Sequence, residues 1–327
     1  MKSWVRQQGF IFGLIAAVLL ALLGPVPAGE YGVLRPEFTT KLGVACIFFL
    51  QGLGLATRQM LAGCRPLRLH VFCIAWNFLL FPALTGALLL PLSLFVPSEL
   101  RLGLWMLSIL PTTVASAAAL TASAGGAVPQ AIFASIVSNV LAVFLVPVLA
   151  AAYLATGPGV EVPLLPVFTK LCLIVLLPLL FGQLVRRLLN ELARKISAKT
   201  RWLNQLIILY LVYLAFAGSV QSGLLSQLKL VSLLIVCSVV VVLLLLSSYL
   251  VWRSAEWLRF DFPERTAAFF CASQKSLATG LPLLASILVV TPLAFDPAVW
   301  MIPLLLFHPL QLLLGALMTS RLAVERF

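Results

Sequence analysis

Apolar residues fill most of the chain in about ten long runs, and short polar segments separate these runs. Each run holds roughly 17–25 residues, the length at which an α-helix crosses about 30 Å of hydrocarbon. The expected spans are residues 8–25, 40–57, 70–95, 101–123, 128–154, 164–186, 203–221, 228–252, 265–290 and 297–319. The pattern therefore predicts an all-α membrane protein with about ten transmembrane helices.

The first run also has features of a cleaved signal peptide. Lys2 and Arg6 precede its apolar residues, and small residues follow it in the segment 25–29. Because many further spans follow, we expect an uncleaved first helix.

The composition supports a membrane protein and argues against several other classes. Hydrophobic residues make up 62% of the chain and charged residues 10%, with a mean hydropathy of +1.12, whereas a soluble domain has about 25% charged residues. The net charge of +12 does not indicate nucleic-acid binding, because the basic residues lie in short loops between apolar runs. The six cysteines show no C-x-x-C spacing, so we expect neither a disulfide framework nor a zinc site.

The loop charges predict the orientation of the chain. Lys and Arg are enriched in alternate loops, at Lys2, Arg6, Arg58, Arg65, Arg68, Arg186, Arg187, Arg194, Lys195, Lys199, Arg201, Arg253, Arg259, Arg265, Arg321 and Arg326. The opposite side holds only Arg35, Lys41, Arg101 and Lys229, with Lys170 close to it. By the positive-inside rule, we expect both termini in the cytoplasm and the chain in the plasma (inner) membrane.

One apolar span carries an unusual cluster of polar residues. Its stretch 269–282 contains Ser273, Gln274, Lys275, Ser276 and Thr279, followed by Gly280 and Pro282, which we expect to break the helix. A lysine at membrane depth must face protein or water, so Lys275 is a candidate for function. All ten acidic residues fall in loops or at span ends, so a proton relay or cation site at the midplane would lack its usual carboxylate.

The fourth and ninth expected spans resemble each other. They begin at Arg101 and Arg265, run apolar, and then become small and polar around a helix breaker. They lie about half a chain apart, and an odd number of spans per half would invert the second copy. We therefore predict one domain over residues 1–327, with inverted repeats at about 8–155 and 164–319 and with helices four and nine broken. Such breaks are typical of a transporter's binding site; the alternative is that Pro and Gly are simply common in membrane helices.

Three further spans contain polar residues at membrane depth. In the fifth span, one helical face carries Ser135, Ser138 and Asn139, which serve either helix packing or ligand binding. Asn77 in the third span is a bulkier amide that packing explains less easily. His308, with Gln311, in the tenth span is either hydrogen-bonded structure or a functional group.

Seven stretches carry a resemblance to a known family. They are IFFLQGLGL (47–55), LHVFCIAWNFLLFPALT (69–85), PTTVASAAALTASAGG (111–126), AIFASIVSNVLA (131–142), PLLFGQLVRR (178–187), FFCASQKSLATGLP (269–282) and LLLFHPLQLLLG (304–315). In this order they resemble the bile acid:sodium symporter family over nearly the whole chain. The similarity is greatest to the branch of the seventh mammalian member and its bacterial relatives.

The resemblance implies a fold of ten helices in two inverted five-helix repeats. A panel domain would contain spans 1, 2, 6 and 7, and a core domain would contain spans 3–5 and 8–10. Substrate would bind in the crevice between them, and alternating access would follow from their relative movement. Typical members couple two sodium ions to the uptake of an organic anion.

The carried-over sodium ligands are incomplete in this sequence. Where the family has a Ser-Asn pair, this chain has Ser116 and Ala117, and where the family has a Glu four residues before Gln274, it has Phe270. A reduced sodium site would consist of Asn77, Ser116, Ser135 and Gln274. Without the carboxylate that compensates the charge of two cations, we do not expect the typical two-sodium coupling.

Lys275 offers four interpretations in this setting. Its ammonium could hold the C-terminal ends of the broken half-helices where sodium would otherwise lie, pair with an anionic substrate in the crevice, or release a proton and permit proton coupling. The fourth alternative is that the side chain extends to a membrane interface.

The sequence thus predicts a secondary transporter of a small organic solute, expected to be anionic, and not an enzyme. The different-class alternative is a regulatory membrane protein that influences calcium homeostasis with little transport. The candidate substrate- or ion-binding residues are Asn77, Thr112, Thr113, Ser116, Ser135, Asn139, Ser273, Gln274, Lys275, Ser276 and His308. We expect no cofactor other than Na⁺, and the sequence does not predict an oligomeric state.

Overall fold

The computed structural model describes residues 2–23, 36–54, 63–92, 95–154, 169–170, 172–223, 228–290 and 296–324. Within these ranges the chain is helical and contains no strand, which confirms the prediction of an all-α protein. Five segments are long and apolar enough to cross a membrane: Leu67–Leu92, Val128–Leu154, Trp202–Ser222, Leu230–Trp257 and Pro297–Leu322. The chain divides into two compact units.

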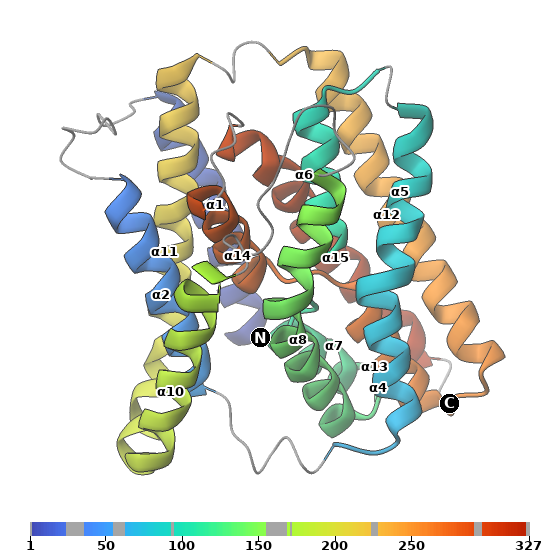
Figure 1. Cartoon of the computed structure of the whole chain (residues 1–327). Helices are drawn as coiled ribbons and strands as arrows, with labels where there is room; N and C mark the ends of the chain where they lie inside the picture. The colour runs from blue at the N-terminus through green and yellow to red at the C-terminus, as the bar shows by residue number, and fades with distance from the viewer. Residues whose placement is uncertain are drawn as a thin grey trace. The chain divides into compact units, whose positions relative to one another are not determined.

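The first unit comprises Met1–Leu55, Leu154–Lys229 and Leu281–Met301. Its helices are α1 (Lys2–Leu23), α2 (Pro36–Gly54), the π-helix η2 (Cys172–Leu176), α10 (Leu177–Leu188) and α11 (Asn190–Ser222), together with most of α14 (Leu277–Val290) and the start of α15 (Pro297–Val324). α2 packs against both α10 and α11, and α11 also packs against α1 (Figure 1). Helix α11 begins well before the expected span 203–221, because the basic segment ahead of it is rich in good helix formers.

Two glycines explain how closely α2 and α10 approach. A Cβ atom on Gly52 would overlap the carbonyl oxygen of Leu179, and one on Gly182 would overlap that of Phe49. Side chains from α10 also satisfy the last carbonyls of α2. Gln183 Nε2 donates to the Gly52 carbonyl at 2.6 Å and Arg186 Nη1 to the Leu53 carbonyl at 2.6 Å.

The second unit comprises Ala56–Tyr153, Leu230–Gly280 and Ile302–Phe327. Its elements are α4 (Leu67–Ala75), the π-helix η1 (Trp76–Leu80), α5 (Phe81–Leu92), α6 (Ser98–Ser108), α7 (Ala115–Ser123), most of α8 (Val128–Leu154), α12 (Leu230–Trp257), α13 (Phe262–Ser273), the start of α14 (Leu277–Val290) and most of α15 (Pro297–Val324). Residues 266–273 of α13 are all buried, and this half-helix packs against α4, α7 and α12.

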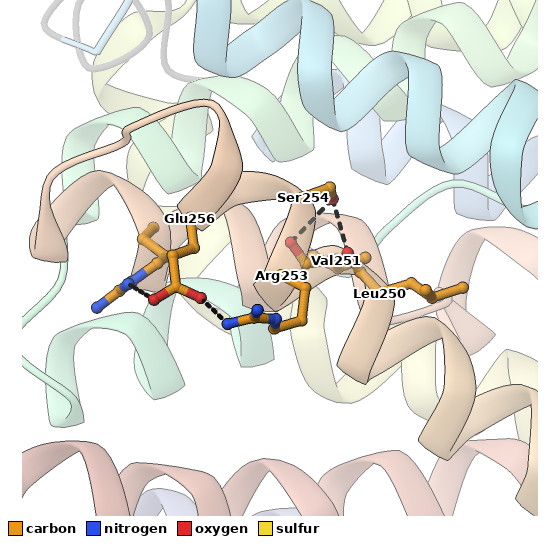
Figure 2. A network of polar contacts seen from close by, with 6 residues as sticks. Leu250, Val251, Arg253, Ser254 and Glu256 are labelled. Carbon is orange, nitrogen blue, oxygen red and sulfur yellow. Dashed lines mark hydrogen bonds and ion pairs between the residues drawn. The ribbon is translucent and has the colours of Figure 1, made fainter.

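Polar contacts join the elements around α12 in this unit. Trp76 Nε1 of η1 donates to Ser254 Oγ at 3.1 Å. Figure 2 shows Ser254 directed back to the carbonyls of Leu250 and Val251 on its own helix. Arg253 and Glu256, which flank Ser254 in the sequence, form an ion pair at 2.5 Å (Figure 2).

Two interruptions divide helices of the second unit. The chain is non-helical between α6 and α7 around Pro111, and again at residues 274–276 between α13 and α14. The prediction that Gly280 and Pro282 break the helix is wrong, because α14 runs through both. The break lies earlier because partners are available there: the Ser276 N–H donates to the Pro111 carbonyl at 2.7 Å, and Ser276 Oγ accepts from the Thr279 N–H at 3.1 Å.

Candidate functional site

The Lys275 side chain is fully buried and is held by three backbone carbonyls. Its ammonium donates to the carbonyl oxygens of Asn77 at 3.0 Å, Ser108 at 2.6 Å and Leu110 at 2.9 Å. Nζ also lies 4.3 Å from the centre of the Phe81 ring. Because an ammonium has three N–H donors, all of them have a partner here.

These carbonyls are available because of the local backbone. α6 ends at Ser108, and the last carbonyls of a helix have no partner within it and carry partial negative charge. In η1, the Phe81 N–H bonds to the Trp76 carbonyl instead of the Asn77 carbonyl, and residue 82 is a proline without an N–H. The Asn77 carbonyl is therefore left to Lys275.

This geometry decides one of the alternatives for Lys275. The side chain does not extend to a membrane interface, so that alternative is wrong. Its contacts are with the C-terminal end of the half-helix α6 and with η1, as in the interpretation of an ammonium that holds a broken half-helix. Which role these contacts serve in transport stays a prediction.

Gln274, Thr113 and Ser116 meet where the two interruptions approach each other. Gln274 Oε1 accepts from Thr113 Oγ1 at 3.0 Å and from Ser116 Oγ at 3.4 Å, and the two hydroxyls are hydrogen-bonded to each other. Thr113 Oγ1 also accepts from the Ala117 N–H at 3.2 Å, within the first turn of α7. Gln274 Nε2 is buried and has no hydrogen-bond partner in the described part of the chain.

Polar residues of α8 hold the first interruption. Asn139 Nδ2 donates to the carbonyls of Thr112 and Ser135, each at 2.8 Å, and Asn139 Oδ1 accepts from Thr279 Oγ1 at 2.5 Å. Ser138 Oγ accepts from the Thr112 N–H at 3.3 Å. The polar face of α8 thus forms hydrogen bonds with both broken helices. Its residues therefore do more than allow helices to pack closely.

Gln311 of α15 holds the second interruption. Its Oε1 accepts from the Lys275 N–H at 2.7 Å, its Nε2 donates to the Lys275 carbonyl at 2.8 Å, and the same Nε2 lies 2.9 Å from His308 Nδ1. Sequence reasoning placed His308 among the candidates but not Gln311. The available signal was a second polar group three residues further on, which lies on the same face of the helix.

The four predicted sodium ligands form two pairs. Ser116 and Gln274 are in contact, as described above, whereas Asn77 Nδ2 donates to the Cys271 carbonyl at 3.0 Å and Ser135 Oγ lies 3.6 Å from Cys271 Sγ. Within the described ranges, no hydrogen bond joins one pair to the other. Ser273 is directed away from these groups, because its hydroxyl donates to the Phe269 carbonyl at 2.7 Å.

This region carries an aromatic side chain where the family has an acidic one. Phe270, at the position of the family's carboxylate, is fully buried in an apolar cluster and packs edge-on against Phe269 at 5.0 Å. Among residues with described side chains, no three His, Cys, Asp or Glu residues lie close enough to hold a metal ion. A cation other than the Lys275 ammonium would have to rely on amide, hydroxyl and carbonyl oxygens.

Comparison with known proteins identifies the family. The model of the SBF-like CPA transporter family matches residues 8–324. The chain belongs to this family. An uncharacterized protein of Pseudomonas aeruginosa is 37% identical over 98% of this chain and 94% of its own length. YfeH of Escherichia coli K12 is 33% identical over 98% and 94%, and sodium/bile acid cotransporter 7 of Xenopus tropicalis is 30% identical over 96% and 91%.

Membership of the SBF-like CPA transporter family confirms the resemblance seen in the sequence. It makes the chain a membrane transporter of the bile acid:sodium symporter type. The transporter family implies a small-molecule solute, and the apolar helices agree with an integral membrane protein.

Proposed function

We propose that the protein is a secondary transporter that moves a small organic anion across the plasma membrane by alternating access. In this proposal the crossing of its broken helices needs no bound sodium, because the Lys275 ammonium supplies the positive charge. The observation that carries the proposal is the binding of Lys275 Nζ by three carbonyls at the interruption of α6 and in η1.

The charges around Lys275 support this role. Backbone carbonyls at the end of a half-helix are typical ligands for the coupling ions of transporters. Three carbonyls take the place of water around the Lys275 ammonium, as they would around a bound ion, and no carboxylate is needed. The presence of Phe270 agrees with this role of Lys275. A Glu at that position would balance the charge of bound cations, and no such balance is needed when the lysine supplies the positive charge.

The organisation of the chain supports the proposed mechanism. We take the architecture to be ten transmembrane helices in two inverted five-helix repeats, with both termini in the cytoplasm. The first compact unit contains α1, α2, α10 and α11, which correspond to the panel spans, together with residues 281–290 of α14 and the start of α15. The second unit contains the two interruptions. Relative movement of two such units is the usual basis of alternating access.

Thermal denaturation of the detergent-purified protein tests the built-in cation. Midpoints are compared in sodium, potassium and choline chloride at equal ionic strength, for the wild type, Lys275→Ala and the control Lys229→Ala, whose lysine is exposed. Because an ion that binds only the folded state raises stability, we expect no sodium-specific rise in the wild type or the control, and a rise in Lys275→Ala. A sodium-specific rise in the wild type contradicts the proposal.

A second experiment tests the solute. The purified protein is screened against organic anions, including bile acid salts, for a rise in the denaturation midpoint, and each stabilising anion is then tested for uptake into proteoliposomes. Stabilisation that Gln274→Ala removes, together with uptake, supports the transporter. If no anion binds, and a calcium phenotype in cells survives both Gln274→Ala and Lys275→Ala, the regulatory alternative replaces it.

A further inference from the structure

The turn between α12 and α13, residues 257–260, contains an arginine in an unusual backbone conformation. Arg259 has φ 55°, and it is the one non-glycine residue with positive φ in the described part of the chain. Its N–H bonds to the Glu256 carbonyl at 2.9 Å, and the Phe260 N–H bonds to the Ala255 carbonyl at 3.1 Å. This pattern is a Schellman motif, in which glycine is the usual residue at the left-handed position. A non-glycine residue in this conformation costs free energy, and the residue that occupies it here is a cation.

The charge of Arg259 is not compensated by its neighbours. Three other arginines at this end of the unit have acidic partners: Arg68 pairs with Glu264 at 2.5 Å, and Arg253 and Arg265 pair with Glu256 at 2.5 Å and 3.6 Å. Figure 2 shows the pair of Arg253 and Glu256. No ion pair involves Arg259 in the ranges that the structure describes, and its side chain is exposed.

Two large apolar side chains accompany this cation. Trp257 is 83% exposed and Leu258 is 47% exposed. The next residue, Phe260, is buried, packs edge-on against Phe72 at 5.3 Å and lies 5.0 Å below the guanidinium of Arg68. Asp261 then caps α13 by accepting from the Glu264 N–H at 2.8 Å. The turn is thus fixed on both sides, and only its apolar residues and its cation are directed outward.

The position of the turn along α12 indicates what it faces. α12 has 28 residues, which correspond to about 42 Å at 1.5 Å per residue, whereas the hydrocarbon core is about 30 Å thick. Its first charged residue is Arg253, so Trp257 lies roughly 6 Å further along the axis, within the headgroup layer. Tryptophan is enriched at this depth, and arginine there binds lipid phosphates.

We propose that the α12–α13 turn binds the headgroup of an anionic phospholipid, with Arg259 on the phosphate and with Trp257 and Leu258 inserted beside the acyl chains. The complementary charge and the depth of the turn favour a lipid over a second copy of the chain. A lipid held here contacts the turn that leads directly into α13, the half-helix that ends at the interruption containing Lys275. Binding at this turn is independent of which solute the protein carries.

The test compares the purified full-length protein with added phosphatidylglycerol or phosphatidylcholine. Thermal midpoints are measured, and bound lipid is counted by native mass spectrometry. Arg259→Gly is an informative variant, because glycine relieves the backbone cost and keeps the turn, so its midpoint without lipid should equal or exceed that of the wild type. We expect it to lose most of the phosphatidylglycerol-specific rise and to bind that lipid about fivefold more weakly.

Arg321→Ala serves as the matched control, since Arg321 is an exposed arginine in the last turn of another apolar helix. The control should keep the response to phosphatidylglycerol. The proposal is overturned if Arg259→Gly keeps the full response, or if Arg321→Ala loses as much, because the effect would then depend on total charge alone. A change from dimer to monomer in Arg259→Gly without lipid would also overturn it and assign the turn to a second copy.

Discussion

The side-chain amide of Gln311 pairs with both backbone groups of Lys275, accepting from its N–H at 2.7 Å and donating to its carbonyl at 2.8 Å. One residue of α15 thus replaces the helical hydrogen bonds that Lys275 gives up at the interruption. The lysine is therefore fixed twice, by Gln311 through its backbone and by three carbonyls through its ammonium. A side chain held at both ends has little freedom to search for other partners.

Gln311→Ala should destabilise the protein strongly. The substitution leaves the N–H and carbonyl of Lys275 without partners in a buried site, and each such group costs about 1–3 kcal/mol. We expect a loss of about 2–4 kcal/mol, seen as a lower thermal midpoint in detergent.

Thr319→Ala on the same helix provides the comparison for Gln311. Thr319 Oγ1 donates only to the Ala316 carbonyl of its own helix, at 2.7 Å. Its removal should change the free energy of unfolding by less than about 0.5 kcal/mol. Equal losses in Gln311→Ala and Thr319→Ala would show that Gln311 does not hold the interruption.

Asn139 and Thr279 should be energetically coupled. Thr279 Oγ1 donates to Asn139 Oδ1, while Asn139 Nδ2 donates to the Thr112 carbonyl, so the amide bridges the two broken helices. In a double-mutant cycle of Asn139→Ala and Thr279→Val, measured by denaturation, we expect a coupling of about 0.5–3 kcal/mol. Additive effects would mean that the two side chains act independently.

The close packing of α2 and α10 gives a third prediction. Gly52→Ala places a methyl group against the carbonyl oxygen of Leu179, so the two helices must separate, at a cost of about 1–3 kcal/mol or more. Gly54→Ala, at the end of the same helix, meets no atom within 4 Å. It should be neutral or stabilise by about 0.4–1 kcal/mol. Thermal midpoints of the two variants that move in the same direction would contradict the packing argument.

The sequence predicted the elements of this fold better than the contacts at the site. Apolar runs of membrane length indicated the helices, and a lysine within such a run was conspicuous because its burial is costly. The partners of Lys275 could not be predicted in the same way, because they are backbone carbonyls that every residue possesses. The partner of Gln311 could not be predicted for the same reason, since it is the backbone of Lys275.

The place of the second interruption shows a related limit. Gly280 and Pro282 are poor helix formers, and local propensity put the break there. The chain instead breaks at residues 274–276, where Pro111 and Gln311, both distant in sequence, accept the released N–H groups. A break occurs where partners exist for the freed backbone groups, and those partners depend on tertiary structure.

The last prediction concerns Pro82, whose missing N–H affects a carbonyl that binds Lys275. Because residue 82 has no N–H, and because the Phe81 N–H bonds to Trp76, the Asn77 carbonyl is free to accept from Lys275 Nζ. Pro82→Ala restores an N–H that can bond to this carbonyl when the ammonium is absent. Lys275→Ala should therefore cost less stability in the Pro82→Ala background than in the wild type, by about 0.5–2 kcal/mol.

Pro91→Ala, within the same helix α5, is the control and should show no coupling to Lys275→Ala in thermal denaturation. Equal coupling for both prolines would mean that helix stiffness, and not the missing N–H of residue 82, gives the Asn77 carbonyl to the lysine.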